Sequence, residues 1–380
     1  MNNYALRYYL PIAGPGTREP CRGNESSFRP CPGFTPKWYR DRLGIDFSEK
    51  WHHDPVYRYN SIISMKKYLS SYFPTIENFR INEEGGIDYS CATLDGIYGS
   101  IMISAIYGQK IYYFKDNWPS TDTAAHYTKE QLSKIPVFNP KTNQVFLDIS
   151  NQMDIIEKKW GKISGYLNYQ GILNNAFKLR GQEIFTDMKD DPEFAMYLFN
   201  HIYETMLETA KLVQERQRSS GFNIDLFSCS NCVINMISPE MYEEFILPFD
   251  IKLSKEFPRF GIHTCNWNAS PYLEKIRKIE KMGYIDMGMD SDLEKARKLF
   301  PDARRNIIYS PVKINEYSLE QIKADFEMIY KTYGPCDITL ADIETNVSEE
   351  RVQKVIEIAE GIARLGMEGG LNERAKRLGL

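Results

Sequence analysis

Short apolar segments alternate with longer amphipathic segments along the second half of the chain. Each apolar segment has the length and composition of a buried strand, and each precedes a segment with the apolar spacing of a helix. The apolar segments cover residues 222–227, 260–265, 284–288, 306–310 and 337–342, and the helices are expected to begin near residues 239, 271, 291, 318 and 348. Five such units in series predict a parallel sheet with right-handed crossovers. Their number favours an α/β fold closed into a (β/α)8 or TIM barrel over an open sheet.

Helix-start signals support these boundaries. A serine precedes either a proline or a pair of acidic residues at three of the expected starts, namely Ser238, Ser270 and Ser348. A serine hydroxyl can accept a hydrogen bond from a backbone N–H in the first turn, and proline tolerates the first helical position. An open dinucleotide-binding sheet is disfavoured, since no strand runs into a G-x-G-x-x-G loop.

The first part of the chain shows a weaker pattern. Apolar runs at residues 111–114, 145–149 and 163–169 predict further strands. Residues 1–85 are rich in proline, glycine and arginine, and we expect loops and short helices there that cap one end of the barrel. The 380 residues exceed the roughly 250 of a bare barrel. We therefore expect an N-terminal extension at 1–85, packed on a barrel at 86–370.

Charge and composition exclude several classes of function. The 47 basic and 51 acidic residues give a net charge of -4, without the basic surface that nucleic acids require. The chain has no stretch of about 20 apolar residues and no N-terminal signal sequence, so we expect no membrane contact and a cytoplasmic protein. Seven cysteines, an odd number, favour reduced thiols or metal ligands over a disulfide framework.

Candidate chemistry lies at the strand ends, because barrel active sites form at the carboxyl ends of the strands. His263 and Cys265 end one predicted strand and, being two positions apart, lie on the same face of it. Imidazole nitrogen and thiolate sulfur are donors that zinc prefers. The alternative is a buried histidine beside an unreactive cysteine.

Two neighbouring strand ends offer a third metal ligand. The preceding strand leads into a polar loop that contains Cys229 and Cys232, although a hydrogen-bonded loop explains this composition equally well. The last strand carries Cys336, Asp342 and Glu344 on one face. Cys336 begins that strand, roughly 20 Å from Asp342, so Asp342 and Glu344 are better candidates than Cys336.

Other polar residues at predicted strand ends have simpler explanations. Asp286, Asp290, Asp292 and Glu183 are more typical of helix caps or solvated carboxylates than of catalytic groups. His52 and His53 are adjacent, so their side chains are expected to diverge and not to form a ready-made site. The chain contains no phosphate-binding loop, no G-x-S-x-G and no H-E-x-x-H motif.

Four segments between about residues 98 and 365 resemble one known family. They read GYLNYQGILNNAFKLRGQEIFTDMKDDPEF, SPEMYEEFILPFDIKL, YIDMGMDSDLEKARKLF and SEERVQKVIEIAEG. Their order and spacing resemble the uroporphyrinogen decarboxylase superfamily, whose members are (β/α)8 barrels. Uroporphyrinogen decarboxylases themselves open with an arginine-rich motif, and the region with Arg29, Arg40 and Arg42 departs from it.

The methyltransferases of this superfamily bind zinc with an H-x-C … C motif. His263-Thr264-Cys265 stands where the first half of the motif is expected, and Ala341 stands where its last cysteine would be. Some relatives use other ligand sets, so Asp342, Glu344, Cys229 and Cys232 stay candidates for the third ligand. The resemblance implies His263, Cys265 and Asp342 as the catalytic residues.

The resemblance further implies the reaction. It implies a zinc-dependent methyltransferase that moves a methyl group between a small methylated substrate and a corrinoid (cobalamin) carried by a partner protein. The aromatic-rich composition favours a methoxylated substrate and an O-demethylase. The alternatives are a decarboxylase, a methylcobamide:thiol methyltransferase and a barrel that binds a ligand without catalysis.

Overall fold

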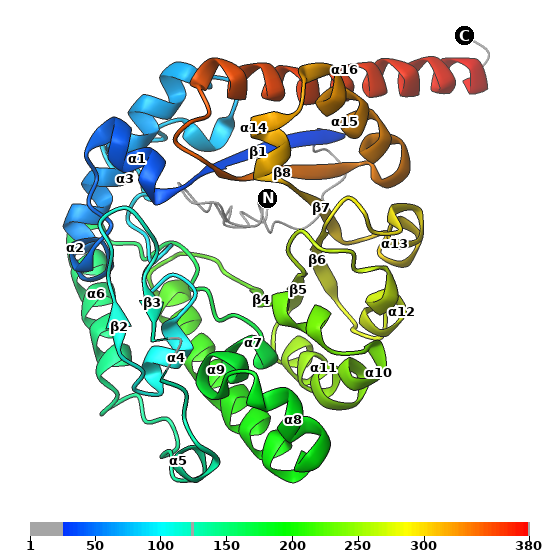
Figure 1. The fold of residues 1–380 in the computed structure, drawn as a ribbon. Coiled ribbons are helices and arrows are strands. Elements are labelled where there is room, and N and C mark those ends of the chain that lie inside the picture. The colour runs from blue at the N-terminus through cyan, green and yellow to red at the C-terminus, as the bar shows by residue number, and fades with distance from the viewer. Residues whose placement is uncertain (1–25, 123–124, 379–380) are drawn as a thin grey trace.

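A six-stranded parallel sheet forms the centre of the molecule in the computed structural model, which describes residues 26–122 and 125–378, with side chains to residue 365. The strand order is β1-β8-β7-β6-β5-β4. Figure 1 shows the strands surrounding the centre, with helices outside them. The strands are β1 (Phe28–Phe34), β4 (Leu226–Ser230), β5 (Arg259–His263), β6 (Met282–Met287), β7 (Arg304–Tyr309) and β8 (Cys336–Ile343).

Two extended segments occupy the remaining barrel positions between β1 and β4. Thr93 and Ser164 form an isolated parallel bridge, in which Leu94 N donates to Ser164 O at 3.0 Å. The Tyr166 hydroxyl then reaches β4, where it donates to Ser228 O at 3.1 Å. With these segments the structure confirms the predicted (β/α)8 class. The segment expected as a strand at 163–169 forms only the isolated bridge at Ser164. On the side facing β4, the Tyr166 side chain makes the contact where backbone hydrogen bonds between strands were expected.

The five strand–helix units predicted in the second half are present. Strands β4 to β8 overlap the five expected segments, and each leads into the helix expected after it. The Ser238 side chain accepts from Met241 N, and Ser348 Oγ accepts from Arg351 N at 3.2 Å, which confirms two of the three serine caps. Ser270 instead begins the 3₁₀-helix η4 (Ser270–Tyr272).

Of the strands predicted in the first half, the one at 145–149 is wrong and the one at 111–114 is confirmed only in part. Residues 145–149 lie inside helix α6 (Gln144–Trp160), because its buried residues recur every three or four positions and the Asn143 side chain accepts from Phe146 N. The apolar run at 111–114 supplies β2 (Ile111–Tyr112), which pairs antiparallel with β3 (Ser120–Thr121) outside the barrel sheet.

The N-terminal region contributes to the barrel itself. Residues 1–85 were expected to be loops and short helices, but β1 lies within them and pairs in parallel with β8. The same region forms the 18-residue helix α3 (Pro55–Tyr72). The alternation of buried and half-buried residues in β1 suits a strand better than a loop. Residues 1–25, on which the expected lack of a signal sequence depends, lie outside the described residues.

The helices cover the outside of the sheet. No helix in the described part of the chain combines the length and apolar character needed to cross a membrane. The remaining helices are α1 (Pro36–Leu43), α2 (Glu49–His53), η1 (Glu77–Phe79), α4 (Met102–Ile106), α5 (Lys129–Ser133), α7 (Ile172–Arg180), α8 (Glu183–Asp190), α9 (Pro192–Ser219), η2 (Cys232–Met236), α10 (Pro239–Met241), the π-helix η3 (Tyr242–Ile246), α11 (Leu247–Glu256), α12 (Leu273–Ile276), α13 (Leu293–Leu299), α14 (Pro311–Glu316), α15 (Leu319–Tyr333) and α16 (Glu349–Leu378).

A buried ion cluster ties together the beginnings of three strands. Asp337 on β8 is fully buried and accepts from Arg29 on β1 at 3.0 Å and from Arg304 on β7 at 2.7 Å. Burial alone would raise the pKa of Asp337, but the two guanidinium groups hold it below its ordinary value. The cluster lies at the opposite end of the strands from the expected active site.

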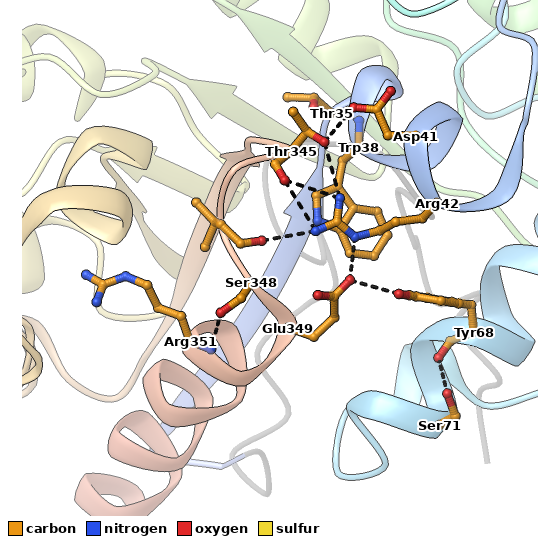
Figure 2. A network of polar contacts seen from close by, with 11 residues as sticks. Thr35, Trp38, Asp41, Arg42, Tyr68, Ser71, Thr345, Ser348, Glu349 and Arg351 are labelled. Atoms are coloured by element: carbon orange, nitrogen blue, oxygen red, sulfur yellow. Dashed lines mark hydrogen bonds and ion pairs between the residues drawn. The ribbon is translucent and has the colours of Figure 1, made fainter.

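A second polar network holds the loop between β8 and α16. Arg42 on α1 binds Glu349, and its guanidinium lies 4.1 Å from the centre of the Trp38 ring. The same guanidinium donates to Val347 O at 3.2 Å, and the Tyr68 hydroxyl of α3 donates to Glu349 at 2.8 Å. Figure 2 shows these groups converging from three segments. The loop after the last strand is therefore fixed to the first helices of the barrel.

Candidate metal centre

Three side chains at the carboxyl ends of β4 and β5 converge. Potential ligand atoms of Cys232, His263 and Cys265 all lie within 4.8 Å of one another, and all three residues are half-buried. His263 ends β5, and Cys232 begins η2 directly after β4. The backbones are in register here, because Asn231 N donates to His263 O at 2.7 Å. This register brings the imidazole and the two sulfurs together.

A chain of hydrogen bonds orients the imidazole of His263. Its Nδ1 lies 2.8 Å from Asp286 Oδ2 on β6, and the Tyr284 hydroxyl donates to the same oxygen at 2.6 Å. Thr264 N donates to the other carboxylate oxygen at 2.9 Å. Because Asp286 engages Nδ1, Nε2 is the nitrogen available to an ion. A carboxylate behind a histidine in this way is the usual support of a metal-binding imidazole.

Only Cys265 among the three groups is shifted toward the form that binds a metal. The hydrogen bond with Cys265 and burial raise the pKa of Cys232, and a raised pKa of His263 favours the protonated imidazole, which does not bind metals. Burial lowers the pKa of His263, but the Asp286 carboxylate and the Cys232 sulfur outweigh it and raise that pKa well above its ordinary value. The hydrogen bond from Cys232 and the neighbouring His263 lower the pKa of Cys265. A low pKa favours the thiolate, which is the form of cysteine that binds metals.

The backbone at the site adopts an uncommon conformation. Cys265 has a φ of 64° and Asp342, at the end of β8, has a φ of 51°. Left-handed backbone costs a residue with a Cβ on the order of 1–3 kcal/mol and persists where its surroundings impose it. The residue before Cys265 imposes this conformation, because Thr264 is held in place by its N–H and its hydroxyl, which both donate to Asp286. The left-handed turn allows Cys265 to face Cys232.

A buried acid supports the loop that carries Cys232. Asp250 on α11 is fully buried and accepts from Asn231 Nδ2 at 2.8 Å and from the Tyr242 hydroxyl at 2.9 Å. Burial raises the pKa of Asp250 to about 7. On its other side Asn231 lies against Gly171, where an added Cβ would meet Asn231 Oδ1 at 2.1 Å. These contacts fix Asn231, the residue before Cys232.

The other candidate ligands lie apart from this group. Asp342 and Glu344 are exposed near the mouth of the barrel. The pKa of Asp342 is raised to about 6, mainly because its carboxylate is partly desolvated by surrounding protein atoms. The nearby charge of Cys265 raises this pKa further, and that of His263 lowers it. Cys229 is buried and bonds to Asp250. Cys336 is buried at the beginning of β8, at the opposite end of the barrel.

The remaining polar residues that the sequence singled out take structural positions. Asp292 caps α13, and Glu183 begins α8 and pairs with Arg180. Asp290 is exposed. His52 is buried, and its Nδ1 accepts from Tyr98 N at 3.0 Å, while His53 bonds to Asp148 at 3.1 Å. The expected divergence of the two histidines is wrong, because they lie in helix α2 and not in a strand, and both rings pack against Tyr113 with ring centres 5.3 and 5.5 Å from it.

Comparisons with solved structures identify the architecture. A methyltransferase from Methanosarcina mazei matches with a TM-score of 0.63 and 14% identity, over 89% of this chain and 94% of that one. The two proteins share a fold. A B12-independent methionine synthase from a Shewanella species matches with a TM-score of 0.46 and 10% identity, over 91% of this chain and 99% of that one. No protein-family model and no curated protein matches the sequence.

The donor set of the candidate metal centre fits a zinc ion. Zinc lies about 2.3 Å from sulfur and about 2.0 Å from nitrogen, so three donors around one ion must lie as close together as these do. Six cysteines in the described residues form no disulfide, which leaves both sulfurs of the centre as thiols. Three protein donors at an open barrel end leave the fourth position of a tetrahedral ion for a substrate.

Proposed function

We propose that the protein is a zinc-dependent methyltransferase that moves a methyl group between a small methylated substrate and a corrinoid on a partner protein. The observation that carries the proposal is the convergence of Cys232, His263 and Cys265 within 4.8 Å at the carboxyl end of the barrel. The fold shared with the Methanosarcina mazei methyltransferase supports the reaction class. The Asp286 support behind His263 favours metal binding over a packing role.

The proposed reaction of a methyl ether is a displacement at the methyl carbon. Zinc bound by the three residues would polarise the ether oxygen as a Lewis acid. The C–O bond would break with its electron pair on the oxygen, and the methyl group would pass to Co(I) of the partner's corrinoid, which supplies the electron pair of the new bond. Asp342, at the rim of the same barrel end, is the residue that we assign to proton delivery to this oxygen. Asp286 holds His263 in the tautomer that directs Nε2 toward the ion.

The positions of Arg29 and Arg42 do not favour the decarboxylase alternative. A decarboxylase of this fold needs cationic side chains that converge on substrate carboxylates. Arg29 is bound to Asp337 at the opposite end of the strands, and Arg42 is bound to Glu349 behind the β8–α16 loop. Both guanidinium groups are therefore committed to the scaffold.

Metal analysis with matched cysteine variants tests the zinc proposal. Protein purified without chelator is expected to contain about one zinc per chain. Cys232→Ser, His263→Ala and Cys265→Ser should each lose it, whereas Cys336→Ser, which changes a buried cysteine at the other end of β8, should keep it. Zinc that persists in all three ligand variants contradicts the proposal.

A spectroscopic assay tests the reaction. Zinc-loaded protein is incubated with a reduced corrinoid protein and a panel of methoxylated aromatics, other methyl ethers and methylthiols, while the cobalt absorption is followed. Methylation by one of the donors, lost in Cys265→Ser and kept in Cys336→Ser, supports the proposal. No change with any donor, in protein that contains zinc, argues against methyl transfer to a corrinoid.

A further inference from the structure

A cavity of about 580 Å³ lies between helix α7 and the segment around β3. One wall is formed by Phe177 and Lys178 of α7, and the facing wall by Ile101, Pro119 and Thr121. A volume of this size is in the range of small-molecule sites, which combine apolar walls with a few polar groups. The cavity could hold a ligand with a single aromatic ring.

Helix α7 connects this cavity to the metal centre. Asn174 Oδ1 accepts from Val233 N of η2 at 3.1 Å, and Val233 follows Cys232 directly. Lys178 is four residues after Asn174 and so lies on the same face of α7, one turn further along. The charge that its ammonium group feels is that of the Cys232 sulfur. Lys178 therefore lines the cavity and is also influenced by the charge of the candidate metal centre.

The ammonium group of Lys178 has no carboxylate partner among the described residues. Burial lowers the pKa of Lys178, and only the charge of the Cys232 sulfur acts in the opposite direction, with no contribution from a carboxylate. Lys66 is another buried lysine, but in contrast to Lys178 it forms an ion pair, with Asp88 at 2.6 Å. Asp122 also lines the cavity, but its carboxylate accepts from the Tyr112 hydroxyl at 3.4 Å and not from Lys178. A cation in this position is left for an anion that enters the cavity.

We propose that this cavity binds a small aromatic anion, a carboxylate or a sulfonate, with Lys178 as the group that binds its charged end. Phe177, Ile101 and Pro119 contact the flat apolar body, and Thr121 offers a hydroxyl to the anion. This inference deepens the proposed function and rests on it for the ligand's role as the substrate. It makes Lys178 a specificity-determining residue, because a neutral analogue would leave the ammonium group unpaired.

Equilibrium binding of three ligands of similar shape tests the inference. Benzoate, benzenesulfonate and neutral benzamide are titrated into the protein at pH 7 and followed by ligand-observed NMR. A charge-assisted hydrogen bond should make at least one anion bind about tenfold or more tightly than benzamide. The two anions distinguish a carboxylate site from a sulfonate site. Equal binding of all three ligands, or no binding of either anion, overturns the inference.

Variants assign the effect to Lys178. Lys178→Met should remove the preference for the anion and leave benzamide binding unchanged, whereas Lys178→Arg should keep it. Lys189→Met, which changes an exposed lysine on α8, is the matched control. Circular dichroism verifies that each variant folds. A preference that survives in a folded Lys178→Met protein also overturns the inference.

The same titration in Cys265→Ser protein separates this inference from the proposed function. Anion binding that depends on Lys178 but persists without zinc supports the cavity whatever the metal analysis shows. If the protein binds zinc but Lys178 has no effect on anion binding, the inference about the cavity is refuted and the proposal of a metal centre is not affected.

Discussion

Nδ1 of His263 and Oδ2 of Asp286 lie 2.8 Å apart, across the gap between neighbouring strands β5 and β6. The bond continues beyond the carboxylate, because the Tyr284 hydroxyl donates to Asp286 and Asn306 Nδ2 donates to Tyr284 at 3.1 Å. The imidazole is thus held by a buried network that reaches β7. Its orientation is a property of the barrel and not of a surface loop.

Asp286→Asn should weaken zinc binding without unfolding the barrel. An amide has one acceptor oxygen, so it cannot accept from His263, Tyr284 and Thr264 together as the carboxylate does. Loss of such support typically lowers metal affinity about 10- to 100-fold. Competition with a chromogenic chelator measures the change, and Asp290→Asn, at an exposed position, is the control. Unchanged affinity would show that His263 does not depend on Asp286.

Asp337→Asn should destabilise the fold and leave the zinc content of the folded protein unchanged. The substitution removes the charge that compensates Arg29 and Arg304, and Arg304 is buried. Breaking a buried ion cluster in this way costs about 3–5 kcal/mol. Urea unfolding gives the free energy of unfolding, and metal analysis of the folded variant gives the second readout. If the free energy of unfolding falls by less than about 1 kcal/mol, the cluster contributes no more to stability than an exposed ion pair, which contradicts this prediction.

Two glycine-to-alanine substitutions should change stability in opposite directions. In Gly171→Ala the new Cβ would meet Asn231 Oδ1 at 2.1 Å and Ser230 O at 2.8 Å, so the loop before Cys232 must move. Overpacking of this kind costs about 1–3 kcal/mol. Gly361→Ala on α16 meets only Arg364 at 3.9 Å and should stabilise the helix by up to about 1 kcal/mol. Thermal unfolding of both variants compares them, and a stable Gly171→Ala would contradict the close contact.

Asp250 should make stability fall as the pH rises from 4 to 7. Its pKa is raised by burial from 3.8 to about 7, so over this range the folded protein keeps a proton that the unfolded chain releases. The stabilisation is complete below the unfolded pKa and is lost as the pH passes through the folded pKa. Relative to Asp250→Asn, the wild-type protein should lose roughly 3 kcal/mol between pH 4 and pH 7. Parallel denaturation curves at both pH values measure the difference.

The sequence was most informative where side chains follow a regular period. His263 and Cys265 could be paired from their spacing, because alternate residues of a strand share a face. Cys232 could not be chosen over a hydrogen-bonded loop, because it begins a 3₁₀-helix and no period links it to β5. Asp342 was favoured from strand parity and from its place at the strand end, neither of which can reveal that its φ is 51° or that its side chain lies outside the group of three.

Longer-range features were beyond the reach of local patterns. The run at 145–149 is as apolar as a strand, and only the later residues of α6 reveal its helical spacing. β1 was missed because its prolines and arginine are typical of loops, yet Arg29 is compensated by Asp337, 308 residues later. The isolation of Lys178 depends on which carboxylates are absent around it in space, and a single sequence carries no signal for that.

The pairing of β1 with β8 has a consequence for synthesis on the ribosome. Arg29 emerges 308 residues before Asp337, so most of the protein is translated while one edge of β1 has no neighbour to pair with. An unpaired strand edge invites association with other chains, and protection of β1 must come from chaperones or from the early helices α1 and α3 until the last strand arrives.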